Sequence, residues 1–73
     1  MNPQQLFERG MNALTGTGPS RSDVQALDYF RRAADLGFVP AQVVLGYFYE
    51  SDTITAANPN HAAEWYRKAA AQT

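Results

Sequence analysis

The chain contains no cysteine and only one histidine, His61, among its 73 residues. Disulfide frameworks, thiolate zinc sites and thiol nucleophiles are therefore excluded, and a single imidazole cannot hold a metal ion without further ligands. Charged residues make up 18% of the chain and the net charge is −1, so there is no basic excess for binding a phosphate backbone. We accordingly expect no cofactor, no metal ion and no nucleic-acid partner.

Long hydrophobic runs are also missing. No stretch approaches the roughly 20 apolar residues that cross a bilayer, and the first residues lack the basic and apolar segments of a signal peptide. These features predict a soluble, cytoplasmic protein without membrane contact. The length predicts one domain over residues 1–73. A domain this small buries only about 60% of the surface of its unfolded chain, so its stability is expected to be marginal without a partner.

What the sequence does contain is an internal repeat. A shift of 36 positions places residues 26–34 over residues 62–70, with four identical and four similar pairs among nine. A period of this length is typical of helical repeat architectures. A shift of 37 would instead align Pro3 with Pro40, which leaves the register of the first helix open by one residue. The predicted units are repeat one, about residues 3–37, and repeat two, about residues 38–73.

The spacing of apolar residues within each unit is helical, because they recur at i, i+3, i+4 and i+7. Helix starts are indicated by Ser22, which can form a capping box with Gln25, and by Asn58, which precedes Pro59. Gly37 suits the position after a helix end. Four helices are therefore predicted, around residues 3–14, 26–34, 40–51 and 62–70.

Small and large apolar residues are expected to have different roles in packing these helices. Gly46 lies inside a predicted helix, where glycine costs roughly 1 kcal/mol relative to alanine, so we expect another helix to come close there. The alanines with the same expected role are Ala33, Ala34, Ala69 and Ala70. The rings expected to fill the space between repeats are Tyr29, Phe30, Phe48, Tyr49, Trp65 and Tyr66.

Two segments of the second unit carry a family pattern. Residues 41–49 read Ala-Gln-x-x-Leu-Gly-x-Phe-Tyr and residues 62–70 read Ala-x-x-Trp-Tyr-x-Lys-Ala-Ala. This pattern resembles the Sel-one-like repeat family, a branch of the tetratricopeptide-type α/α solenoids. The first unit keeps the second helix and the glycine-containing loop at residues 16–18. It has Arg9 where the family has leucine and Ala13 where it has tyrosine, as a terminal, capping-type repeat would.

The resemblance implies an all-α fold, in which four helices form two helix-turn-helix repeats of a right-handed, tetratricopeptide-like superhelix. It also implies a non-catalytic protein–protein interaction module, an adaptor or scaffold, that binds a peptide or a partner helix by its repeat surface.

Candidate partner-binding residues lie on the third helix. If its largest apolar residues face inward, then Val43, Tyr47 and Glu50 share a different face at spacing i, i+4, i+7. In the solenoids that this chain resembles, that face lines the concave groove that receives peptides, and tyrosine is enriched at interfaces. Phe7 and Met11 are the counterparts on the first helix. The alternative is that a neighbouring helix partly covers Val43 and Tyr47.

Catalytic roles are not indicated by the ionisable residues. His61 falls in the first turn of the last predicted helix, where exposed polar residues are common. Asp28 stands three and four residues before Arg31 and Arg32, and Glu64 stands likewise before Arg67 and Lys68. These residues are expected to form surface ion pairs at spacing i, i+3 and i, i+4. We therefore expect no enzyme activity.

Two repeats are fewer than the three or so that a solenoid usually needs for stability. We therefore expect self-association or a tightly held protein partner, through apolar groups on the last or the first helix. Two other functions stay open on the sequence. One is a small inhibitor or immunity-type protein that blocks one enzyme. The other is an enzyme subunit whose site is completed at an oligomer interface, with His61 as the residue to test.

Overall fold

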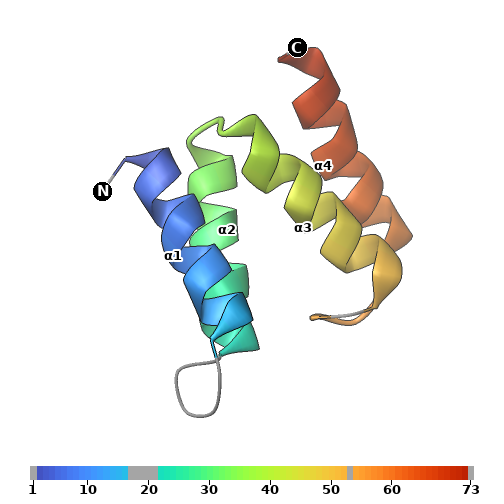
Figure 1. The fold of residues 1–73 in the computed structure, drawn as a ribbon. Coiled ribbons are helices and arrows are strands. Elements are labelled where there is room, and N and C mark those ends of the chain that lie inside the picture. Colours follow the sequence, from blue (N-terminus) through green and yellow to red (C-terminus); the bar gives the residue numbers. More distant parts are fainter. Residues whose placement is uncertain (1, 17–21, 53, 73) are drawn as a thin grey trace.

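The fold is described by a computed structural model for residues 2–16, 22–52 and 54–72. Thr17 and Gly18 of the predicted loop lie outside these residues. The described residues form helices of 13 residues each and contain no strand, which confirms the predicted all-α fold. The helices are α1 Pro3–Thr15, α2 Asp23–Asp35, α3 Val39–Ser51 and α4 Pro59–Ala71 (Figure 1).

Both helices of the pair recur with the same shift of 36 residues. Helix α3 begins 36 residues after α1, and α4 begins 36 residues after α2, so the first helix follows the same shift as the second. Helix α1 packs against α2, α2 against α3, and α3 against α4. As Figure 1 shows, α1 and α4 therefore lie at opposite ends of the stack.

Side chains cap the starts of three helices. Asn58 Oδ1 accepts a hydrogen bond from the backbone N–H of His61, as its predicted capping role requires. Ser22 Oγ accepts from the backbone N–H of Gln25 at 3.2 Å. The complete capping box is at the start of α1, where Asn2 and Gln5 exchange two hydrogen bonds between side chain and backbone. This box was not among the helix starts predicted from the sequence.

The turn between α2 and α3 depends on Gly37. Its φ of 90° lies in the left-handed region, which favours glycine. The N–H of Gly37 donates to the carbonyl of Ala34, and the N–H of Phe38 donates to that of Ala33, which is a Schellman motif. This short turn returns the chain directly onto α2, so α3 packs against the helix that precedes it.

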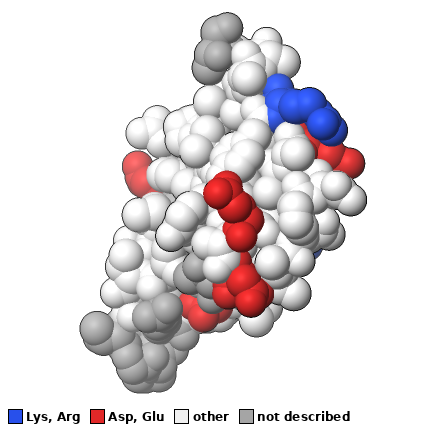
Figure 2. Space-filling model, turned by 90° about the vertical axis from the view of Figure 1, so that its right-hand side faces the viewer, with Lys and Arg blue, Asp and Glu red and all other residues white. Residues whose placement is uncertain are grey.

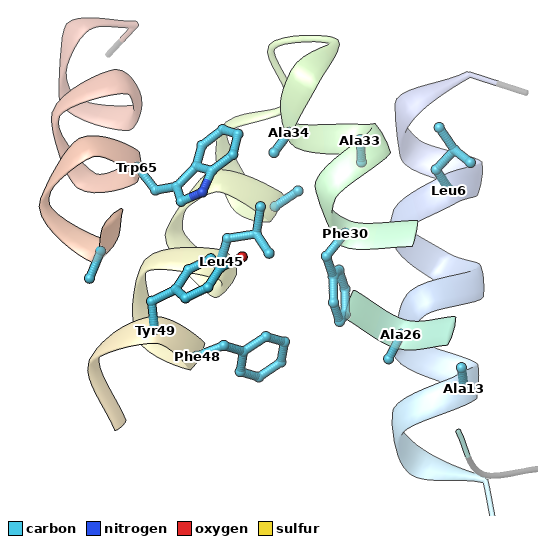
Figure 3. Packing of buried hydrophobic residues seen from close by; sticks show 12 residues of the cluster. Leu6, Ala13, Ala26, Phe30, Ala33, Ala34, Leu45, Phe48, Tyr49 and Trp65 are labelled. Carbon is cyan, nitrogen blue, oxygen red and sulfur yellow. The ribbon is translucent and has the colours of Figure 1, made fainter. Parts of the chain in front are cut away.

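The core is formed by rings that meet across the helices. Phe30 of α2 is fully buried, and its ring centroid lies 5.6 Å from that of Phe48 on α3. Trp65 of α4 extends past α3 toward Ala34 of α2 (Figure 3). Burial of Phe30, Phe48, Tyr49 and Trp65 confirms the prediction for these rings. Tyr29 and Tyr66 are only partly buried.

The predicted packing role of the alanines holds for three of the four. Ala33, Ala34 and Ala69 are buried, but Ala70 is exposed. Ala34 contacts the second repeat, where the side chain of Gln42 on α3 donates a hydrogen bond to the carbonyl oxygen of Ala34. The described residues contain no helix on the outer side of α4, so the prediction was wrong for Ala70.

Each helix pair is closed by a glycine that faces a ring. A Cβ atom placed on Gly46 of α3 would lie 2.5 Å from Cε1 of Tyr66 on α4. A Cβ atom on Gly10 of α1 would lie 2.9 Å from Cε1 of Phe30 on α2. Both distances are shorter than real Cβ contacts, so the absence of a side chain allows each ring to come close to its partner helix.

Replacement of Gly46 by leucine should therefore destabilise the protein by about 1 to 3 kcal/mol through overpacking against Tyr66. The measurement is the urea midpoint of unfolding. In a Tyr66→Ala background the same replacement should cost less, because the ring is gone. An unchanged midpoint for Gly46→Leu would show that Tyr66 does not fill this space in solution.

Candidate partner-binding surface

The three candidate residues on α3 lie along one exposed face of the helix. Val43 is 45% exposed and Tyr47 is 55% exposed, and Glu50 is also exposed. The opposite face of α3 is anchored by the buried side chains of Leu45 and Phe48. Val43 and Tyr47 thus remain accessible to solvent, while the described residues cover part of each side chain.

The two candidates on α1 differ from each other. Met11, the counterpart of Tyr47, is 39% exposed. Phe7, the counterpart of Val43, is only partly exposed, because its ring lies 5.3 Å from that of Phe30 and 5.4 Å from that of Phe38. Phe38 directly precedes α3, so these rings join α1 to the beginning of the next repeat. Phe7 is therefore only partly accessible to a partner.

Glu50 is held in place by the neighbouring helix. The hydroxyl of Tyr66 on α4 donates a hydrogen bond of 2.7 Å to Glu50 Oε2. This bond raises the pKa of Tyr66 above its ordinary value of 10.0, because it holds the phenolic proton. Burial of the ring and the negative charge of Glu50 act in the same direction. The carboxylate at the end of the exposed face of α3 is thus oriented by α4.

Gln42 has a structural role that was not predicted from the sequence. Its side chain is buried, and its Nε2 donates to the carbonyl oxygen of Ala34 in α2. Its Oε1 accepts from Nε2 of Gln72, which also donates to the carbonyl oxygen of Lys68. A glutamine in a helix with few polar residues was the available signal. The amide links the ends of α2 and α4 to α3 and satisfies its own buried polar atoms.

His61 packs against an aromatic ring. Its imidazole is stacked on Tyr49 with ring centroids 4.1 Å apart, and Trp65 follows one turn later at 6.2 Å. Its backbone N–H donates to Asn58. In the part of the chain that the structure describes, no three His, Asp or Glu side chains are grouped to hold a metal ion. The geometry thus gives His61 a contact between α3 and the start of α4.

The expected ion pairs on the two equivalent helices have different outcomes. Asp28 and Arg32 of α2 form a salt bridge of 3.0 Å, as predicted. In α4, Lys68 Nζ instead lies 4.5 Å from the centroid of the Trp65 ring, where a cation is attracted by the π-face.

Figure 2 shows the side of the molecule on which α4 lies. Acidic side chains run through its middle and lower part, and basic ones are confined to an upper edge.

The geometry defines the class of this protein. Two antiparallel helix pairs are stacked with a 36-residue period and a shared core, which is the architecture of an α/α solenoid. The Sel1 repeat family model matches residues 6–38 and again residues 39–73. The chain belongs to the Sel1 repeat family.

Two similar proteins illustrate this relationship. The chitin synthase regulator SKT5 of Saccharomyces cerevisiae is 39% identical over 59 residues, which are 78% of this chain and 8% of that protein. The crystal structure of a Sel1 repeat protein from Oxalobacter formigenes superposes with a TM-score of 0.87 at 38% identity. That match covers 97% of this chain and 54% of the other. This chain thus spans about half of the solved protein and a small part of the yeast regulator.

None of the helices in the described residues has the length and apolar character that crossing a bilayer requires.

Replacement of Glu50 by glutamine should lower the pKa of Tyr66 toward its ordinary value, because the negative charge that holds the proton is removed. Ultraviolet titration of tyrosinate measures this change, with Tyr66→Phe identifying the signal. Since the folded-state pKa of Tyr66 is raised, its contribution to stability is complete below the unfolded value near 10 and is lost as the pH rises through the folded value. Identical titration curves for wild type and Glu50→Gln would contradict the hydrogen bond.

Proposed function

We propose that the chain is a non-catalytic protein–protein interaction module, which binds a peptide or a partner helix through the exposed face of α3. Val43, Tyr47 and Glu50 form this surface, and Met11 with the exposed part of Phe7 extends it onto α1. The observation that carries the proposal is the exposure of Val43 and Tyr47 one turn apart on a helix whose other face is buried.

The chemistry of this face suits a partner that presents an apolar residue and a hydrogen-bond donor. Val43 and Tyr47 offer apolar contact area, and tyrosine contributes more binding energy per residue than most side chains. Glu50 accepts hydrogen bonds and is already fixed by Tyr66, so less side-chain entropy is lost when a donor binds it. A rigid helix surface with one oriented carboxylate favours a segment that places a basic or amide group beside an apolar residue.

The similar proteins support a regulatory function rather than a catalytic one. The yeast relative is a chitin synthase regulator by name, and Sel1 repeats are the part that it shares with this chain. The shared segment is a small fraction of that protein. Its partners therefore do not identify the partner of this chain, which must be found directly.

The combined replacement of Val43 by glutamate and Tyr47 by alanine should weaken partner binding at least about tenfold, because losing one central contact residue costs about 2 kcal/mol or more. The partner is first recovered by affinity capture from the native host, and its binding is then measured by calorimetry. Both side chains are exposed, so the helical circular dichroism signal should be unchanged.

A matched control for this variant is Val24→Glu, which places the same charge on an exposed valine of α2. The control should bind the captured partner as wild type does. If the Val43 and Tyr47 variant also kept wild-type affinity, the exposed face of α3 would not be the binding surface.

We also propose that a second protein contact completes the stack, by self-association or by a tightly held partner. Two repeats bury less surface than a longer solenoid. Ala70 of α4 is exposed where its counterpart Ala34 of α2 is buried. The outer side of α4 is therefore the place where such a contact would add the most buried apolar area.

The isolated chain should accordingly be either associated or of low thermal stability. Light scattering gives its mass, and thermal unfolding followed by circular dichroism gives its melting temperature. A strict monomer of 8.1 kDa that also melts at high temperature would remove the need for this second contact.

A further inference from the structure

Three polar side chains meet at the end of the exposed face of α3. The ring of Tyr66 lies over Gly46, where no Cβ atom would fit, and its hydroxyl reaches Glu50 Oε2 at 2.7 Å. Tyr47 stands three residues before Glu50, so these two side chains are neighbours on the surface of α3. Tyr47 is also close enough for its charge to raise the pKa of Tyr66. Two phenol rings thus lie beside one carboxylate.

The first repeat shows that helix packing does not require these polar groups. A shift of 36 residues places Met11, Leu14 and Phe30 at the positions of Tyr47, Glu50 and Tyr66. None of the three residues in the first repeat has a hydroxyl or a carboxylate. The ring of Phe30 nevertheless packs against Gly10 as that of Tyr66 packs against Gly46. The polar atoms of the second repeat therefore have a function other than holding its two helices together.

The end of α3 is negative and has no cation of its own. The last turn of α2 contains Arg32 and that of α4 contains Lys68, whereas the last turn of α3 contains no basic residue. The carboxyl end of a helix attracts positive charge, so Glu50 adds charge of the unfavourable sign there. Asp52, which follows α3 directly, is a second exposed carboxylate. Among the described residues Glu50 has no ion pair, and its partner is the neutral hydroxyl of Tyr66. A positive group is therefore what this end of α3 lacks.

The chemistry of these groups suits a guanidinium. A guanidinium is planar, stacks on aromatic faces and donates hydrogen bonds to a carboxylate in a fixed geometry. Tyr47 is 55% exposed, so its ring is accessible for stacking. The hydroxyl of Tyr66 binds Oε2 of Glu50, and no described residue donates to Oε1. An accessible ring and an unused carboxylate oxygen are thus presented side by side.

We propose that Tyr47, Glu50 and Tyr66 form a subsite for an arginine side chain of the segment that binds the exposed face of α3. The guanidinium donates to Glu50 Oε1 and stacks on Tyr47, while Tyr66 holds the carboxylate in place. Val43 lies one turn before Tyr47, so an apolar residue of the same segment contacts it there. This inference rests on the proposed function and adds to it that the bound segment is basic.

The test adds a small probe, N-acetyl-arginine amide, to the whole chain and follows the chain by nuclear magnetic resonance. The ring signals of Tyr47 and Tyr66 and the side-chain signals of Glu50 should move together in one saturable titration. N-acetyl-citrulline amide has nearly the same shape without the charge, and it serves as the control at equal ionic strength. Its binding should be at least about threefold weaker, as expected when a surface ion pair is lost.

Three conservative variants locate the subsite. Glu50→Gln should weaken binding of the arginine probe at least about threefold, because the charge is lost while the size is kept. Tyr66→Phe removes only the hydroxyl that orients the carboxylate, so its effect should be smaller. The matched control Glu64→Gln removes the same charge from an exposed position of α4 and should bind the probe as wild type does. The backbone amide spectrum checks that each variant keeps the fold.

Several results would overturn the arginine subsite. They are equal binding of the arginine and citrulline probes, wild-type binding by Glu50→Gln, and a titration that leaves the signals of Tyr47 and Tyr66 in place. The captured partner separates this inference from the proposed function. A partner that loses affinity with the Val43 and Tyr47 variant but not with Glu50→Gln would overturn the subsite alone. A probe that binds as expected, with a partner that responds to neither variant, would instead overturn the proposed function.

Discussion

The stack depends on the contact between a glycine of the first helix and a ring of the second helix in each pair. Gly10 faces Phe30, and Gly46 faces Tyr66. Each ring lies closer to the glycine than a Cβ atom there would allow. This contact sets the separation of the two helices in each hairpin. Both hairpins contain this contact, so residues 36 positions apart occupy equivalent places in the two hairpins. The second hairpin can therefore pack against the first.

This constraint explains why much of the fold could be predicted. A glycine inside a helix is unfavourable unless something comes close, so Gly46 indicated a helix contact before the partner ring was known. The helix boundaries followed from Asn58 and Gly37, whose local chemistry does not depend on the rest of the chain. The structure then fixed the register of α1, since both glycines meet the equivalent ring.

Other features could not be predicted, because they depend on which neighbours are present. Ala70 has a local sequence similar to that of Ala34 but no helix over it among the described residues. Phe7 packs against Phe38, which lies in the turn that follows α2. Periodicity within α1 cannot show this contact. Gln42 has its hydrogen-bond partners in two other helices. The exposure of Val43 and Tyr47 also depends on the neighbouring helices, so it follows only from the arrangement of all four.

The two ends of the stack give the chain a direction. At the α1 end, the apolar residues that join repeats are replaced by Arg9 and Asn12, which water solvates well. At the α4 end, Tyr66 and Ala70 retain the character of the joining surface. The α1 end is therefore polar, whereas α4 exposes part of a ring and an alanine whose counterparts in α2, Phe30 and Ala34, are buried.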